Sequence, residues 1–230
     1  GKDYVDELLN PTDLARLVAI RRDSDLRFSV HLPADLGLLT PEISDEELAS
    51  RLEVLAHVYE ICAGLEPESF ILHLDSPPGI VLSPEVRAMA ASRALAGLAK
   101  RLPDASQRFL VENTAWNLRI AANHLAEAGF GVCADFGHLH QHGLSIPDFL
   151  GTFGPSIREV HLHGFDASGD HLPLAAMDNP TLEPVRWLLP TDENAVVVSA
   201  NILTAEPDLL VGDTLTLDIK AHGIMRGRAR

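Results

Sequence analysis

Residues 109–118 read FLVENTAWNL, an apolar run that ends at Glu112 and passes directly into Asn113 and Thr114, where the chain must turn. A single acid or histidine at the end of a strand is more often a cap, a turn former or a satisfied polar residue than a functional group. Whether Glu112 has a functional role therefore depends on whether other strands of the chain also end in an acid or a histidine.

Short apolar or β-branched runs alternate with longer helical patterns along the chain. The helical patterns cover residues 40–65, 83–102 and 117–130, where apolar residues recur three and four positions apart. This alternation is typical of βα units around a buried parallel sheet, and it predicts an α/β fold of the (β/α)8 TIM-barrel type. The expected strands span residues 26–32, 69–75, 108–113, 131–136, 158–164 and 194–200.

The composition predicts a single domain, residues 1–230, because a chain of this length with 46% hydrophobic residues can bury one large core. The formal net charge of -15 opposes nonspecific contact with nucleic acid or anionic membranes. Cys62 and Cys133 are too few for a disulfide framework and fit a reducing compartment. No apolar run reaches the roughly 18 residues of a membrane span and nothing resembles a signal peptide, which predicts a cytoplasmic protein.

The first five predicted strands all end in a residue that can bind a metal ion. In a TIM barrel the C-terminal ends of the strands converge on one face, so residues distant in sequence meet there in one pocket. Coincidence at every strand is a poor explanation for this pattern. The five residues are His31, His73, Glu112, Asp135 and His161.

More candidates follow two of these strands. His138 lies three residues after Asp135 in a polar loop. A glycine-containing loop, FDASGDHLPL (residues 165–174), adds Asp166, Asp170 and His171. His and carboxylate ligands suit zinc, manganese or iron, and their number predicts more than one ion. His163 is a weaker candidate ligand. The remaining histidines are not expected to bind metal, because His57 and His124 lie on predicted helix faces and His140 and His142 follow His138 in the polar loop.

Three of these stretches resemble motifs of a known superfamily. VENTA (residues 111–115), ADFGHL (134–139) and VHLHG (160–164) are similar to motifs of the xylose isomerase-like barrels, which include endonuclease IV and AP endonuclease family 2. The similarity covers residues 30–174. The resemblance implies a site for several divalent ions, zinc or manganese, with the ligands His31, His73, Glu112, Asp135, His138, His161, Asp170 and His171.

Within the superfamily, FSVHLPADL (residues 28–36), FILHLD (70–75) and REVHLHGFD (158–166) look most like the cobamide-remodelling hydrolases. Those enzymes cut the phosphodiester in the nucleotide loop of vitamin B12-like cofactors. The resemblance implies a small-molecule phosphodiester substrate, with Glu112, Asp135 and His171 as catalytic residues and Glu112 as the bridging carboxylate. Nucleic acid is not expected as a partner, because the loops that carry the ligands have almost no Lys or Arg.

The sequence departs from the family pattern in two places. The family has a metal-binding Glu at the end of its last strand, where this chain offers Asn201, with Asp218 in TLTLDIK (residues 214–220) as the nearest acidic substitute. The VHLP motif belongs on the third strand, so the barrel is expected to be incomplete at its N-terminus, with no strand before residue 26. We expect TLTLDIK to form a strand that pairs near residues 194–200 or fills part of the gap, and an open sheet edge would favour a homodimer.

Three functions remain open. The first is metal-dependent hydrolysis of a phosphodiester, with Glu112 shared between ions. The second is a sugar isomerase or epimerase of the same superfamily, which uses one ion and two glutamates as acid and base, although the last-strand partner of Glu112 is absent. The third is a degenerate barrel that binds a ligand without catalysis. One ion per chain would favour the isomerase, and two or three would favour the hydrolase.

Overall fold

The computed structural model describes residues 11–23, 27–166, 169–172, 197–200, 214–220 and 223–226. Its strands are β1 (Arg27–His31), β2 (Ser69–His73), β3 (Phe109–Glu112), β4 (Gly131–Asp135), β5 (Ile157–Leu162), β6 (Gly164–Asp166), β7 (Gly169–Leu172), β8 (Val197–Ala200), β9 (Thr214–Lys220) and β10 (Gly223–Arg226). Its α-helices are α2 (Pro11–Arg22), α3 (Asp45–Cys62), α4 (Pro84–Arg101), α5 (Ala122–Ala128), α6 (Phe136–Gln141) and α7 (Ile146–Phe153). Short 3₁₀ helices are η1 (Ala63–Leu65), η2 (Ser106–Arg108), η3 (Leu118–Ala121) and η4 (Gly154–Ser156).

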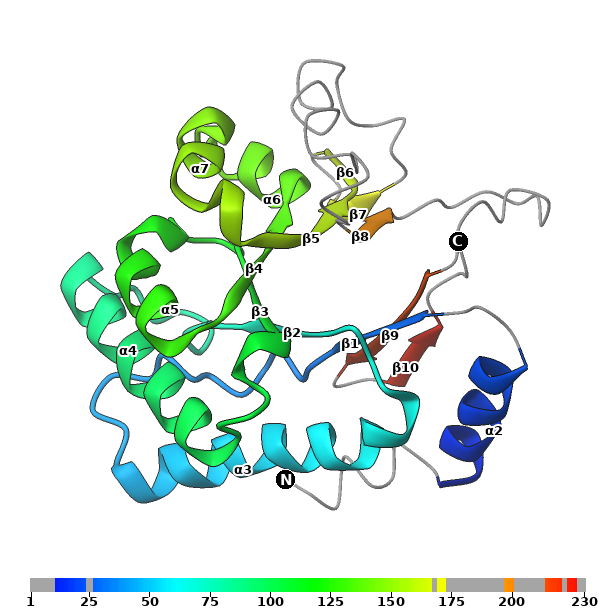
Figure 1. Ribbon diagram of the computed structural model, residues 1–230. Helices are drawn as coiled ribbons and strands as arrows, with labels where there is room; N and C mark the ends of the chain where they lie inside the picture. The colour runs from blue at the N-terminus through cyan, green and yellow to red at the C-terminus, as the bar shows by residue number, and fades with distance from the viewer. Residues whose placement is uncertain are drawn as a thin grey trace.

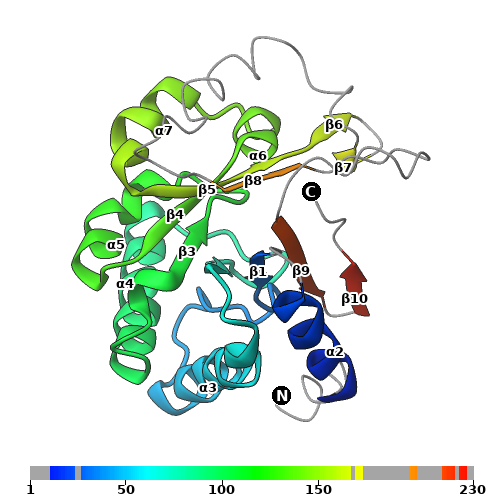
Figure 2. The same ribbon diagram turned by 45° about the vertical axis from the view of Figure 1, so that its right-hand side comes forward.

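The main sheet has eight strands in the order β10-β9-β1-β2-β3-β4-β5-β8, and only the β9–β10 pair is antiparallel. The helices α3, α4, α5 and α7 lie on the outer side of this sheet (Figure 1). The strands curve around a common interior, as the turned view shows (Figure 2). The arrangement is a parallel β/α half-barrel, which confirms the predicted TIM-barrel class.

Alternating faces of the strands separate the core from the barrel interior. In β1, Phe28 and Val30 are fully buried in the large hydrophobic cluster between the sheet and its helices. Ser29 and His31 point the other way, because successive side chains of a strand lie on opposite faces. The interior face of β1 to β5 therefore carries one predicted ligand at or next to the C-terminal end of each strand: His31, His73, Glu112, Asp135 and His161.

A row of aromatic side chains packs the sheet against α3. The rings of Phe70 and Phe109, from adjacent strands, stack with centroids 5.4 Å apart. Tyr59 of α3 lies 4.9 Å from Phe70, and Phe130 lies 5.9 Å from Phe109. Offset and edge-on contacts of this kind add to the free energy gained by burying the rings. The aromatic row thus fixes β2 and β3, the strands that carry His73 and Glu112.

The TLTLDIK segment forms strand β9, but its position differs from one expectation. β9 pairs in parallel with β1, and Asp218 is in register with His31. The prediction that it pairs near residues 194–200 was wrong, because β8 adds to β5 at the opposite edge of the sheet. The alternative, that it fills part of the gap before β1, is confirmed. Within the described residues no strand precedes Arg27, and the homodimer stays a prediction.

Two stretches predicted to be loops are regular structure. His138 and His140 lie in α6, because the Asp135 side chain accepts a hydrogen bond from the backbone N of His138 and caps that helix. Asp170 and His171 lie in β7, which pairs with β6 in a small antiparallel sheet. No helix in the described ranges is both long enough and apolar enough to span a membrane.

Candidate metal centre

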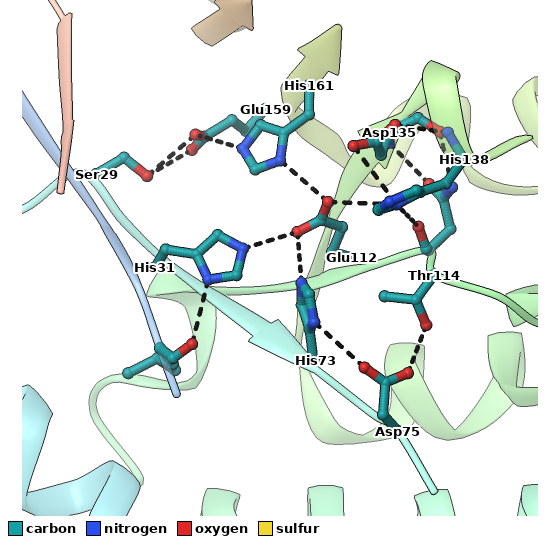
Figure 3. Close-up of polar contacts among 12 residues, drawn as sticks. Ser29, His31, His73, Asp75, Glu112, Thr114, Asp135, His138, Glu159 and His161 are labelled. Atoms are coloured by element: carbon teal, nitrogen blue, oxygen red, sulfur yellow. Dashed lines mark hydrogen bonds and ion pairs between the residues drawn. The ribbon is translucent and has the colours of Figure 1, made fainter. Parts of the chain in front are cut away.

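Six of the eight predicted ligands meet at the C-terminal ends of adjacent strands (Figure 3). Five end or nearly end a strand of the main sheet, and His138 comes from the first turn of α6. The predicted convergence on one face is confirmed for these six. They are His31 on β1, His73 on β2, Glu112 on β3, Asp135 on β4, His161 on β5 and His138 on α6.

Glu112 lies at the centre of the cluster and is only 2% exposed. Its Oε2 is 3.1 Å from His31 Nε2 and 2.9 Å from His73 Nε2. Its Oε1 is 3.1 Å from His161 Nδ1 and 3.7 Å from His138 Nδ1. Four imidazoles from four elements therefore surround one carboxylate, as Figure 3 shows.

In His31, His73 and His161, the ring nitrogen that does not face Glu112 is held by an acceptor outside the cluster. His31 Nδ1 donates to the Leu32 carbonyl at 3.1 Å. His73 Nδ1 lies 3.2 Å from Asp75 Oδ2, and Thr114 Oγ1 donates to the other Asp75 oxygen at 2.6 Å. Metal-binding histidines in proteins show this pattern, because the outer acceptor fixes the tautomer and aims the other nitrogen at the ion.

His161 has its outer acceptor deeper in the barrel. Its Nε2 lies 3.3 Å from Glu159 Oε1, and Glu159 is fully buried. Ser29 Oγ donates to both oxygens of Glu159 at 3.0 Å, and Ser69 Oγ donates to Oε2 at 2.5 Å. The buried charge of Glu159 thus has hydrogen-bond donors from two other strands.

Glu159 was not among the residues singled out from the sequence. The alternation along β5 places it on the same face as His161, two residues later, and that period was the available signal. Cys133 was likewise not among the predicted ligands, and its presence was used only to argue against a disulfide framework. It is fully buried, and burial raises its pKa well above the ordinary value. Its sulfur belongs to a possible ligand group with Glu112 and His161.

The ends of β3 and β4 are tied together by Asn113, which is fully buried. Its Nδ2 donates to the Asp135 carbonyl and its Oδ1 accepts from the Asp135 backbone N, both at 2.8 Å. Asp135 Oδ1 accepts from the His138 backbone N at 2.8 Å. The other oxygen, Oδ2, accepts no hydrogen bond within the described part of the chain, although His138 Nδ1 is 3.5 Å away.

The charges of the central groups depend on one another. Burial disfavours ionised Glu112, but His161 and His73 outweigh it and hold the pKa of Glu112 well below its usual value. Burial also disfavours the charged ring of His73, yet Glu112 and Asp75 raise its pKa to about 10. Burial also lowers the pKa of His161, but Cys133 and Glu112 outweigh this effect and raise that pKa well above the ordinary value. Glu112 therefore requires positive charge beside it, from protons or from metal ions.

The donor set fits divalent metal ions. In each of three groups the ligand atoms lie within 4.8 Å of one another, and Glu112 belongs to two of the groups. Imidazole, carboxylate and thiolate are ligands of zinc, and the first two also suit manganese and iron. Asp135 Oδ2, which accepts no hydrogen bond from the described residues, is the buried acceptor that an ion would satisfy. The groups are His31, His73 and Glu112; Glu112, Cys133 and His161; and Asp135, His138 and His163.

The remaining predicted residues are placed only in part. The backbones of Asp170 and His171 lie in β7, close in sequence to the end of β5, and their roles as ligands stay predictions. Asp218 lies on β9 in register with His31 rather than beside β8. Asn201, the residue at the position of the missing glutamate, follows β8 outside the described residues.

No protein-family model and no curated protein sequence matches the chain. Solved structures match its fold. The IolI protein with a binding zinc atom gives a TM-score of 0.65 at 12% identity, covering 84% of this chain and 73% of that chain. The TTHB071 protein from Thermus thermophilus, soaked with zinc chloride, gives 0.60 at 25% identity, covering 85% and 81%.

Two further structures represent different activities. Endonuclease IV from Thermus thermophilus gives a TM-score of 0.52 at 21% identity, covering 86% of this chain and 77% of that chain. L-ribulose 3-epimerase gives 0.57 at 19% identity, covering 84% and 67%. The solved structures that this chain resembles are xylose isomerase-like TIM-barrel proteins, which establishes the fold and leaves the reaction to be inferred from the site.

Proposed function

We propose that the protein is a metal-dependent hydrolase that cleaves a phosphodiester in a small or medium-sized ligand. The observation that carries this proposal is the sharing of Glu112 between two adjacent ligand groups, with a third group beside them. Such a set of ligands suits several ions close together, the arrangement found in many enzymes that displace groups at phosphorus. On the resemblance of its motifs, a cobamide nucleotide loop is the first substrate to test.

The chain's own residues prepare this site for anionic chemistry. Divalent ions bound there would supply Lewis acidity toward the phosphate oxygens and activate the attacking water. Glu112 holds opposite imidazoles at fixed distances through its two oxygens. Asp75 orients His73, and Glu159 orients His161, so the rings need little reorganisation when they bind. The formal net charge of -15 further disfavours a polyanionic nucleic acid.

The main rival is a sugar isomerase or epimerase, since epimerases share this fold. That chemistry needs a carboxylate or another base directed at a substrate carbon. Glu112 is enclosed by imidazoles on both oxygens and is 2% exposed, which suits a ligand better than a base that must reach substrate. The hydrolase therefore agrees better with the described geometry.

The decisive experiment has two parts. The first counts zinc and manganese per chain by inductively coupled plasma mass spectrometry, and the second assays the loaded protein with bis(p-nitrophenyl) phosphate, a cobamide panel and ketohexoses. We expect two or three ions and phosphodiester cleavage. One ion with sugar epimerisation would replace the proposal by the isomerase, and no turnover of any substrate would indicate a binding protein.

Two variants locate the activity. Glu112→Gln should abolish turnover and lower the bound metal while leaving the fold intact, because it removes charge compensation from a polar pocket rather than core packing. Glu127→Gln is the matched control, since its carboxylate on α5 is 76% exposed. Full activity in Glu112→Gln would exclude the mechanism.

A further inference from the structure

We propose that His163 is a metal ligand and that it forms, with Asp135 and His138, an ion position distinct from the one that His31 and His73 share with Glu112. This inference extends the proposed function, in which several ions are bound. Ligand atoms of the three residues lie within 4.8 Å of one another. All three are buried, with exposed fractions of 0% for Asp135, 8% for His138 and 1% for His163.

The hydrogen bonds of His163 determine where its lone pair lies. Its Nδ1 is 3.1 Å from the carbonyl oxygen of Gly164, which can only accept, so Nδ1 carries the hydrogen. In the neutral ring the lone pair is then on Nε2. That atom lies 3.1 Å from Asp135 Oδ1. Two electron-pair donors face each other at this distance in a buried place, which requires a cation, either a proton or a metal ion, between them.

Asp135 supplies the second, independent observation. Its Oδ1 already accepts from the backbone N of His138, whereas Oδ2 accepts no hydrogen bond within the described residues. A buried carboxylate oxygen without a donor is costly and uncommon in native proteins. A proton on His163 would compensate Oδ1 but would leave Oδ2 with only the His138 ring beside it, whose Nδ1 is 3.5 Å away and donates to Asn113. Both carboxylate oxygens can reach a metal ion. An ion therefore explains the short distance between Oδ1 and His163 Nε2 and also the missing hydrogen bond at Oδ2.

The helix α6 is shaped to accept the His163 ring. A Cβ atom at Gly137 would lie 2.5 to 2.7 Å from three atoms of that ring, a separation that real side chains do not show. Only glycine therefore lets His163 pack against the first turn of α6, between Asp135 and His138. The His138 and His163 rings meet edge to face with centroids 4.8 Å apart. His138 is itself oriented, because its Nδ1 donates to the Asn113 carbonyl at 3.2 Å.

Two imidazoles and one carboxylate define the chemistry of this position. The same donor set holds zinc in many catalytic sites and is also used for iron(II) and manganese. A site with three protein ligands leaves room for a water molecule or a substrate oxygen. His163 would thereby add an ion next to the ions bound by Glu112, beside the C-terminal end of β5 and the first turn of α6.

The test counts ions rather than turnover. The full chain is loaded with zinc, freed of excess by gel filtration, and analysed by mass spectrometry as wild type, His163→Gln and His124→Gln. His124 lies on α5, outside the proposed site, and serves as the matched control. We expect His163→Gln to hold one zinc fewer than wild type, with an affinity loss at that position of more than about 100-fold, the upper range known for outer-shell partners. Equal zinc in His163→Gln and wild type would overturn the assignment.

A second measurement needs no substitution, so it stands even where His163→Gln fails to fold. Anomalous scattering at the zinc edge from crystals of the loaded wild-type protein should place a peak about 2.0–2.1 Å from His163 Nε2. Peaks beside Glu112 with none at His163 would show that a proton bridges His163 and Asp135. Because neither readout uses activity, a zinc ion at His163 in a protein that cleaves no phosphodiester would remove the proposed function and leave this inference standing.

Discussion

Replacing Asn113 by Leu should destabilise the protein and weaken zinc binding together. The Asn113 side chain makes two hydrogen bonds of 2.8 Å to the backbone of Asp135, one as donor and one as acceptor. These bonds join the end of β3 to the end of β4, and so fix Glu112 relative to Asp135. Leucine has a similar volume but can neither donate nor accept.

The magnitude follows from the groups left behind. Each lost hydrogen bond contributes about 1 kcal/mol net, and each buried backbone group left without a partner costs about 1–3 kcal/mol. These two amounts overlap, and partial relaxation lowers their sum, so we expect a loss of about 3 kcal/mol. Zinc affinity should fall at least about 10-fold, as for residues that orient ligands without touching the ion.

Urea denaturation of the EDTA-treated protein measures the stability term, and zinc titration with a chromogenic chelator measures the affinity. Asn117→Leu is the matched control, because Asn117 is exposed and only caps η3 through the backbone N of Arg119. The control should lose about 1 kcal/mol or less and keep its zinc affinity. A loss for Asn113→Leu no larger than for Asn117→Leu would refute the argument that this amide holds the strand ends together.

Four further outcomes are expected. Zinc binding at about pH 8 should release protons, because the pKa of His73 is raised to about 10 and a ring that binds zinc must be neutral. Calorimetry in two buffers of different ionisation enthalpy would detect the release, and its absence would contradict the assignment of His73 as a ligand. The stability that this raised pKa gives the metal-free protein is complete below the ordinary value of 6.5 and is lost as the pH rises toward about 10, so Tm should fall across that window. Glu159→Gln should lower zinc affinity about 10- to 100-fold through His161, and an unchanged affinity would make Glu159 purely structural. Phe109→Ala should cost about 3–5 kcal/mol in urea denaturation without changing the number of ions per folded chain.

The ends of the strands were predictable because the apolar residues of each buried strand give way there to residues that can bind a metal ion. A parallel strand covered on both faces reads as a mostly apolar run, and the His or acid that ends the run lies at the C-terminal edge of the sheet. His31, His73 and Glu112 could thus be placed from their own segments alone. The C-terminal strand could not, because the sequence of residues 214–220 is compatible with either open edge of the sheet. In the structure β8 occupies the edge beside β5, and β9 pairs with β1 on the other side of the sheet.

The partners of Glu159 and His163 lie on other elements, and these partners could not be predicted from the sequence. Glu159 is compensated by Ser29 and Ser69, which are 130 and 90 positions away. The segment REVHLHG alone does not predict that the inward-facing Glu159 accepts hydrogen bonds from two serine hydroxyls. His163 depends in the same way on Gly137, whose missing Cβ opens the space for the ring. Both are pairings between elements, and a pattern along one element does not encode them.

The three buried acids of the site are compensated to different degrees, and this difference has consequences for folding. Glu159 accepts hydrogen bonds from two serines, and Glu112 is met by imidazoles on both oxygens. Asp135 is fully buried and has one oxygen without a hydrogen bond in the described part of the chain. A buried charge that is only partly compensated is the costly case, and its cost falls on the metal-free state, which lacks the ion. Ion binding should therefore stabilise the fold most at Asp135, so that chelation loosens β4 and α6 before it affects β1 and β2.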